Sequence, residues 1–150
     1  MSIAERAWEF KKKYSGTICW RIDKHAKIVE EYVNPDEKVL YVFCGQKNHL
    51  FRDFFTSCVV VLTNKRILIG QKRVVWGSFL TQITPDLYND MKIYRGLFFG
   101  RIIIDTLKEE VVISNLAKSS LDEIETAISS FMMEAKKEYK KDKKWKSYYH

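Results

Sequence analysis

Cysteine and histidine are the residues of this chain whose side chains most readily do chemistry, as nucleophiles or as metal ligands. These residues are Cys19, Cys44, Cys58, His25, His49 and His150. The cysteines are an odd number without a CxxC pair, which favours buried free thiols in a reducing compartment over disulfides or a metal site. A Cys–His pair brought together by folding stays open, but no nucleophile motif accompanies it. We therefore predict no catalytic residue, no metal site and no cofactor.

Recognisable catalytic and phosphate-binding motifs are absent, because the chain has no GxSxG, HExxH or GxxxxGK[ST] pattern. Gly96 and Gly100 bracket an aromatic turn and do not open a helix, which argues against a phosphate-binding loop. Arg66 could bind an anion, but its position at the start of a strand favours pairing with a neighbour or with solvent. Asp105 ends an aliphatic strand and is interpreted as a turn residue. The sequence thus predicts a protein that is not an enzyme, with no small-molecule substrate.

The basic C-terminal tail, residues 135–150, is the most unusual stretch of the chain. It carries seven lysines against Glu138 and Asp142, a net charge of +5, interleaved with Tyr and Trp. Lysines are attracted to anionic lipid, and amphipathic rings settle at headgroup depth. The candidate anion- or lipid-binding residues are Lys136, Lys137, Lys140, Lys141, Lys143, Lys144, Trp145 and Lys146.

Two other interpretations of the tail remain open. It could contact nucleic-acid phosphates, weakly and with steep salt dependence. It could also be a helix that overruns the domain and ends in a solubilising, lysine-rich segment. Weaker anion-binding candidates are Lys47 and Arg52, in a polar segment, residues 46–53, that we interpret as a loop.

The composition is that of one packed domain. The chain has 150 residues, of which 46% are hydrophobic and 14% aromatic, and a net charge of +7. No apolar run approaches the ~20 residues that span a bilayer, and charged residues occupy the N-terminal stretch where a signal peptide would be apolar. We therefore expect a cytoplasmic protein, with peripheral attachment to the inner face of the membrane as the alternative. Residues 1–16 carry a net +2 and residues 17–134 sum to zero, which argues against a basic nucleic-acid groove.

Hydrophobic periodicity predicts two N-terminal helices followed by strands. Apolar residues recur at helical spacing in residues 2–14, and again after Thr17, a predicted N-cap, until Asn34-Pro35 ends the second helix. Strands are then predicted at 38–44, 59–62, 67–69, 73–80, 87–95, 101–106 and 110–114. The strongest is the hairpin CVVVLTNKRILIG, where β-branched residues flank a polar turn.

A long amphipathic helix is predicted after the strands. Ser120 followed by Glu123 matches a capping box, and Ile124, Ile128, Phe131, Ala135 and Tyr139 form its apolar stripe. The fold class is therefore mainly β, with N-terminal helices before an antiparallel sheet and a helix after it. We place no domain boundary: residues 1–33 form a helical preface, residues 37–133 the core with its helix, and residues 135–150 the tail.

The runs VVVLTNKRILIG, YRGLFFGRIIIDT and VVISNLAKSSLDEIETAI resemble the bacterial pleckstrin-homology-like domains of the YokE-like type, over residues 31–133. The resemblance implies a seven-stranded, strongly bent and partly closed antiparallel sandwich, with a C-terminal helix at one open end. Domains of this superfold bind lipids, peptides or copies of themselves. Phosphoinositide-binding relatives use several Lys and Arg residues around the first two strands, where this chain offers only Lys47 and Arg52.

Two functions follow as hypotheses. The first is a non-enzymatic interaction module that binds a protein partner or self-associates through the edges of an incompletely closed sheet. The second is a peripheral membrane adaptor that binds anionic lipid through the tail.

Overall fold

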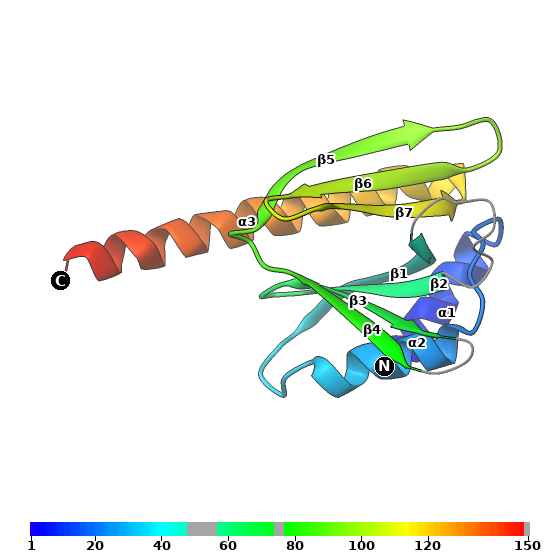
Figure 1. Cartoon of the computed structure of the whole chain (residues 1–150), viewed down its shortest axis with the longest axis horizontal. Coiled ribbons are helices and arrows are strands. Elements are labelled where there is room, and N and C mark those ends of the chain that lie inside the picture. The colour runs from blue at the N-terminus through cyan, green and yellow to red at the C-terminus, as the bar shows by residue number, and fades with distance from the viewer. Residues whose placement is uncertain (48–56, 74–76, 149–150) are drawn as a thin grey trace.

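The computed structural model describes residues 1–47, 57–73 and 77–148, with the backbone alone for residue 139 and residues 142–148. Its elements confirm the predicted order of two helices, seven strands and one helix (Figure 1). In chain order they are α1 (Ile3–Lys13), α2 (Ile22–Tyr32), β1 (Val39–Lys47), β2 (Ser57–Thr63), β3 (Ile67–Lys72), β4 (Ser78–Ile83), β5 (Tyr88–Arg95), β6 (Gly100–Thr106), β7 (Glu110–Leu116), a short 3-10 turn (Lys118–Ser120) and α3 (Leu121–Tyr148).

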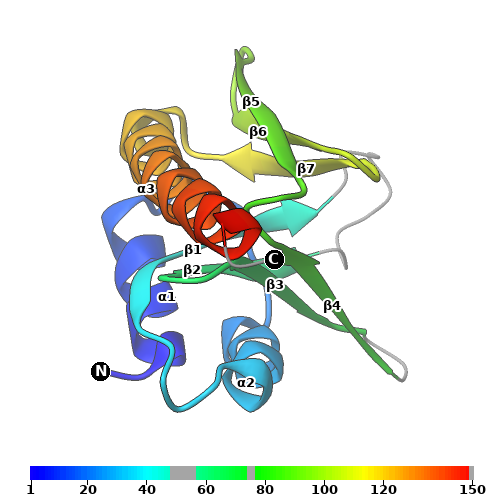
Figure 2. The same cartoon turned by 90° about the vertical axis from the view of Figure 1, so that its left-hand side faces the viewer.

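The strands form one open antiparallel sheet in the order β4-β3-β2-β1-β7-β6-β5. The pairing of β1 with β7 is short, Gln46 opposite Ser114 and Lys47 opposite Ile113. Beyond these pairs the two strands diverge, so the sheet bends into a β1–β4 half and a β5–β7 half (Figure 2). Helix α3 runs along the opening between the halves, which confirms the expectation of a C-terminal helix that covers an incompletely closed sandwich.

The predicted central hairpin is β2 and β3, with Leu62 opposite Ile67. Every residue of β2 is buried, because α1 and α2 cover the outer face of this half of the sheet while α3 covers the inner one. A strand that is buried on both faces has a continuous apolar sequence without alternation, and the sequence of β2 has this pattern. Helix α2 lies so close to β3 that a Cβ on Gly70 would come within 2.5 Å of the Val29 side chain.

The region between α1 and α2 differs from the prediction. Helix α2 begins at Ile22, and its N-cap is Arg21 in the left-handed region, at φ 56°. The hydroxyl of Thr17, predicted as the cap, instead accepts a hydrogen bond of 2.9 Å from the backbone N–H of Ala117. Cys19 lies in this connection and not in a helix. Long-range pairing with the end of β7 has thus overridden the local capping preference.

Two strand boundaries also differ. Strand β1 extends through Lys47, so the predicted loop cannot begin at Gln46. The fourth strand begins at Ser78 and ends at Ile83, later than predicted, and Trp76 at the centre of the predicted strand lies outside the described residues.

Helix α3 buries its predicted apolar stripe through Ala135, while the side chain of Tyr139 lies outside the described residues. The predicted capping-box residues bond elsewhere. Ser120 Oγ donates to the Ala117 carbonyl at 2.7 Å, and Glu123 binds residues of α1 and β1. The helix then continues to Tyr148, so the basic tail has a helical backbone that projects beyond the sheet (Figure 1).

Candidate functional site

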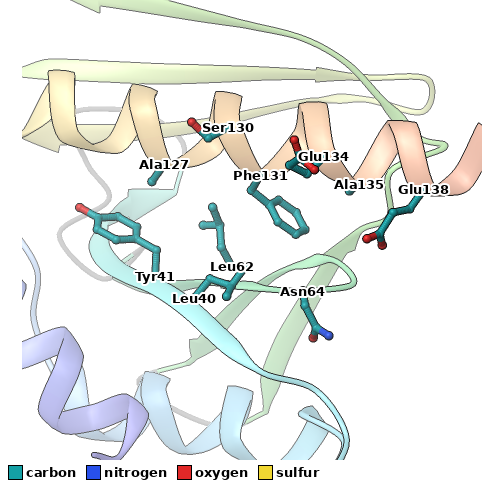
Figure 3. Close-up of a pocket in the computed structure, with 10 residues that line it drawn as sticks. All are labelled: Leu40, Tyr41, Leu62, Asn64, Ala127, Ser130, Phe131, Glu134, Ala135 and Glu138. Carbon is teal, nitrogen blue, oxygen red and sulfur yellow. The ribbon is translucent and has the colours of Figure 1, made fainter.

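A groove of about 460 Å³ lies between α3 and the hairpin formed by β1 and β2 (Figure 3). It exists because β1 has diverged from β7 at this point and the helix only partly fills the opening. The lining residues are Leu40, Tyr41, Leu62, Asn64, Ala127, Ser130, Phe131, Glu134, Ala135 and Glu138.

The floor of the groove is apolar and its helical rim is acidic. Phe131 projects from α3 towards Leu40 and Leu62 (Figure 3). Leu40 remains 42% exposed, so the groove presents apolar surface to solvent. Glu134 and Glu138, four residues apart on α3, are both exposed beside it. Chemically, the groove suits an apolar side chain carried on a positively charged segment.

A polar network borders the groove and joins three elements. Glu123 of α3 accepts hydrogen bonds from Tyr41 Oη at 2.7 Å and from Lys13 Nζ at 2.6 Å. Burial alone would raise the pKa of Glu123, but these two bonds outweigh it and hold that pKa below its usual range. Burial, with the bond to Glu123, raises the pKa of Tyr41, so the phenol stays protonated and acts as the donor.

The edge of β1 beside the groove is covered. Arg6 of α1 donates to the carbonyls of Val39 and Leu40 at 2.9 and 3.0 Å. Such capping blocks strand addition where β1 has left β7. The edge strands of the sheet are instead β4 and β5, in keeping with the expectation that an incompletely closed sheet leaves edges able to pair.

The predicted site residues fall at two separate places. Lys47 ends β1 and donates to Thr81 Oγ1 at 2.8 Å, while Arg52 lies outside the described residues. In the tail, Lys136 Nζ lies 5.4 Å from the centre of the Tyr88 ring and Lys137 Nζ lies 4.0 Å from Glu134. Lys140 and Lys141 are exposed. Of the predicted tail residues, four have side chains outside the described part of the structure: Lys143, Lys144, Trp145 and Lys146.

Arg66, considered as an anion ligand, is occupied within the fold. Its guanidinium donates to Glu37 at 2.5 Å, to Gln82 Oε1 at 2.6 Å and to the Tyr32 carbonyl at 2.8 Å. Pairing with neighbours, the favoured interpretation, is therefore confirmed. Asp105 accepts a hydrogen bond of 2.9 Å from Asn89 across the β5–β6 pair.

The three cysteines, separated in sequence, come together in the core. Cys44 and Cys58 lie on the paired strands β1 and β2, and Cys19 Sγ lies 3.6 Å from the Cys58 carbonyl. The hydrogen bond with Cys19 and burial raise the pKa of Cys44, and burial raises that of Cys58. Protonated buried thiols are poor nucleophiles and poor metal ligands. Within the described residues, no cluster of His, Cys, Asp or Glu could hold a metal ion.

Of the histidines, His25 alone lies in the described part of the chain. Burial is the main cause that lowers its pKa to about 4, with a smaller contribution from Arg21. Its Nδ1 accepts a hydrogen bond of 2.8 Å from the backbone N–H of Lys72. This neutral, hydrogen-bonded imidazole joins α2 to β3 and has a structural role.

The groove could not be predicted from the sequence. Its floor combines side chains of β1, β2 and α3, and no local pattern brings these together. One signal was available: Glu134 and Glu138 repeat at four-residue spacing beside the apolar stripe of a helix whose remaining tail is basic.

Comparisons with known proteins give a family match. A family model described as a bacterial PH domain matches residues 33–130. The chain is similar to the crystal structure of a pleckstrin homology domain from Shewanella amazonensis SB2B, at 14% identity over 73% of this chain and 86% of that one, with a TM-score of 0.48. It is also similar to a DUF1696 family protein with a pleckstrin-homology domain from Shewanella loihica PV-4, at 15% identity over 73% and 92%, with a TM-score of 0.49.

No curated protein matches the chain. Among the described helices, none is both long and apolar enough to cross a membrane.

Proposed function

We propose that this chain, which belongs to the bacterial PH domain family, is a non-enzymatic cytoplasmic interaction module that self-associates through the groove between α3 and the β1–β2 hairpin. The observation that carries the proposal is the groove itself, with an apolar floor and an acidic rim. Buried free thiols fit the reducing cytoplasm, and the sequence offers no catalytic motif.

The occupant that we propose is the basic tail, residues 135–150, of a second copy. Its net charge of +5 complements the rim formed by Glu134 and Glu138, and its aromatic residues suit an apolar floor. The part of the tail beyond Glu138 cannot reach the groove of its own chain, because α3 continues as a straight helix away from the sheet (Figure 1). Two chains related by a two-fold axis could each place a tail in the groove of the other.

The test is the mass of the full chain in solution. Light scattering is expected to give a mass above that of the monomer, without lipid, and replacing the exposed groove residue Leu40 with Arg should return the monomer mass. The charge reversals Glu134→Lys and Glu138→Lys should also shift the mass towards the monomer, because a basic rim repels the basic tail. Leu107→Arg is the matched control, since Leu107 is an exposed leucine in the β6–β7 turn and should not change the mass.

A labelled peptide with the sequence of residues 135–150 provides the second measurement. Binding of the peptide by the full chain, weakened by Leu40→Arg, supports the tail as the occupant. A wild-type chain that is monomeric at all concentrations and does not bind the peptide rules out this mode of association. Assembly that persists in the Leu40→Arg variant places the self-association elsewhere, with the β4 and β5 edges as the next candidates.

A second candidate function, peripheral membrane attachment, is favoured by the projection of the tail. Lys140 and Lys141 are exposed on a part of α3 that lies beyond the sheet. Each lysine near an anionic surface contributes about 1 kcal/mol, so a net charge of +5 gives at most roughly 5 kcal/mol, which corresponds to millimolar binding. Several copies acting together, or insertion of aromatic residues, would be needed for stable attachment.

Liposome flotation checks this second function. We expect anionic vesicles, and not neutral ones, to carry the full chain at low salt, and high salt to release it. A variant in which the tail lysines from Lys140 to Lys146 are replaced with Gln should not float with the vesicles. If that variant floats as well as the wild type, the tail is not the anchor.

A further inference from the structure

The three buried cysteines differ in their access to solvent. Cys19 is 8% exposed, whereas Cys44 and Cys58 are 0% exposed. Cys19 also lines a small cavity of about 190 Å³, together with Lys11 of α1 and Trp20 of the connection between α1 and α2. A small molecule that enters this cavity can therefore reach Cys19 first.

Cys19 is held against a second thiol. The thiols of Cys19 and Cys44 are hydrogen-bonded to each other, although the two residues lie 25 positions apart in the sequence. The backbone of the connection is fixed on either side of Cys19, because Ile18 N–H donates to the Asn115 carbonyl at 2.9 Å and Trp20 N–H donates to Ser57 Oγ at 2.8 Å. Two thiols in contact meet the first requirement for a disulfide, which is that the side chains point towards each other.

Strand register sets Cys58 apart from this pair. Cys44 lies opposite Val59, and Gly45 lies opposite Cys58. Directly paired residues share a face of the sheet, and successive residues point to opposite faces, so the Cys58 side chain points away from the Cys44 side. Cys19 Sγ contacts the backbone carbonyl of Cys58, at 3.6 Å. The cluster therefore consists of one pair, Cys19 and Cys44, and a third thiol behind the sheet.

Lys11 places a positive charge in the wall of the cavity. Its Nζ donates to the Ser15 carbonyl at 2.7 Å, which holds the ammonium group near the connection. The charge also acts on Cys44, where it opposes the rise in pKa that the hydrogen bond with Cys19 and burial cause. Neighbouring cations are a common feature of reactive cysteines, and an ammonium group can donate to an oxygen attached to sulfur.

We propose that Cys19 and Cys44 form a reversible redox pair that a small peroxide oxidises through this cavity. In the first step the Cys19 sulfur attacks one oxygen of hydrogen peroxide, and the O–O bond breaks. The attacked oxygen stays on Cys19 as a sulfenic acid, and the other oxygen leaves with the thiol proton as water. In the second step the Cys44 sulfur attacks the Cys19 sulfur. The S–O bond breaks, and the hydroxyl group leaves with the Cys44 proton as a second water.

The two thiols thus give two electrons to one peroxide and become a disulfide. A dithiol reductant restores them by thiol–disulfide exchange. Disulfides in a reducing compartment are usually transient ones of this kind, so free thiols in the resting protein agree with the proposal. The cavity has room for hydrogen peroxide, since a water-sized molecule takes up about 30 Å³.

The disulfide would fasten the α1–α2 connection to β1. This connection also carries Thr17, whose hydroxyl accepts the N–H of Ala117 just before α3. The redox pair uses neither the groove nor the tail, so its failure would leave the proposed function standing, and the reverse also holds.

The experiment treats the reduced full chain with a small molar excess of hydrogen peroxide and counts the free thiols. The count is expected to fall from three to one, with the loss of two hydrogens from the intact mass. Digestion without reductant should give a peptide pair that joins Cys19 to Cys44, and dithiothreitol should restore all three thiols. In urea the same treatment should no longer favour this pair over pairs with Cys58, because only the fold brings Cys19 and Cys44 together.

Two variants separate the roles of the thiols. Cys44→Ala removes the resolving thiol, so Cys19 should stop at the sulfenic acid, which dimedone captures. Cys58→Ala is the matched control, since it removes a buried cysteine of the neighbouring strand and should still form the Cys19–Cys44 disulfide.

Four results would overturn the proposal. The treated wild type could keep three free thiols, its disulfide could contain Cys58 or join two chains, or the same pairs could form equally in the folded state and in urea. A folded Cys44→Ala variant in which dimedone does not label Cys19 would likewise overturn it.

Discussion

Replacing Arg66 with Ala is expected to lower the free energy of unfolding by about 3–5 kcal/mol, the usual cost of removing one partner of a buried ion pair. The Glu37 side chain is 0% exposed and that of Arg66 16% exposed, with their charged atoms 2.5 Å apart. Burial alone would raise the pKa of Glu37, but hydrogen bonds from Arg66 and Thr63 hold it below its usual range. Without Arg66, the carboxylate would remain buried with its charge uncompensated.

The neighbouring turn residue provides the control. Lys65 pairs with Asp36 at 2.6 Å, but both side chains are largely exposed, so Lys65→Ala should cost less than about 1 kcal/mol. Urea denaturation of both variants at neutral pH measures the difference. Equal losses for Arg66→Ala and Lys65→Ala would show that the buried pair does not stabilise the turn as argued.

Acidification is expected to destabilise the protein through His25. The folded state holds the pKa of this imidazole at about 4, below the unfolded value of about 6.5. The unfolded chain therefore binds the extra proton first, so stability is complete above about pH 6.5 and falls as the pH drops towards 4. The total loss of unfolding free energy is about 3 kcal/mol. The slope reaches about 1.4 kcal/mol per pH unit where the imidazole is protonated in the unfolded chain and neutral in the folded one.

The variant His25→Asn isolates this contribution. Its Oδ1 can replace Nδ1 as acceptor for the Lys72 N–H, and it cannot titrate. Carboxylates also titrate in this range, so the quantity to compare is the change in unfolding free energy between pH 7 and pH 4.5, wild type against variant. The wild type should lose more. Parallel pH dependence, or an NMR titration of His25 near pH 6.5 in the folded state, would contradict the argument.

The groove and the tail occupy successive parts of α3. Figure 1 shows the tail leaving the sheet opposite the β5–β6 turn, and the groove is lined by residues of α3 up to Glu138, just before the tail projects. The mass and flotation experiments together distinguish these contacts, because Leu40→Arg changes the groove and leaves the tail lysines intact.

Local pattern determined most of the fold. The β-branched runs on either side of Thr63–Arg66 predicted the β2–β3 hairpin, and the stripe from Ile124 to Ala135 predicted the buried face of α3. Side-chain crowding and hydrophobic period act over a few residues, so the sequence alone carries these signals. Thr17 shows their limit: its hydroxyl could have capped a helix but accepts the N–H of Ala117, 100 residues away.

The functional surfaces were decided by tertiary structure. The Glu37 partner of Arg66 is 29 residues distant, the cysteines meet through strand register, and the groove exists where β1 leaves β7. Local preference determines which helices and strands form. Strand register and burial then decide which of them meet at a surface.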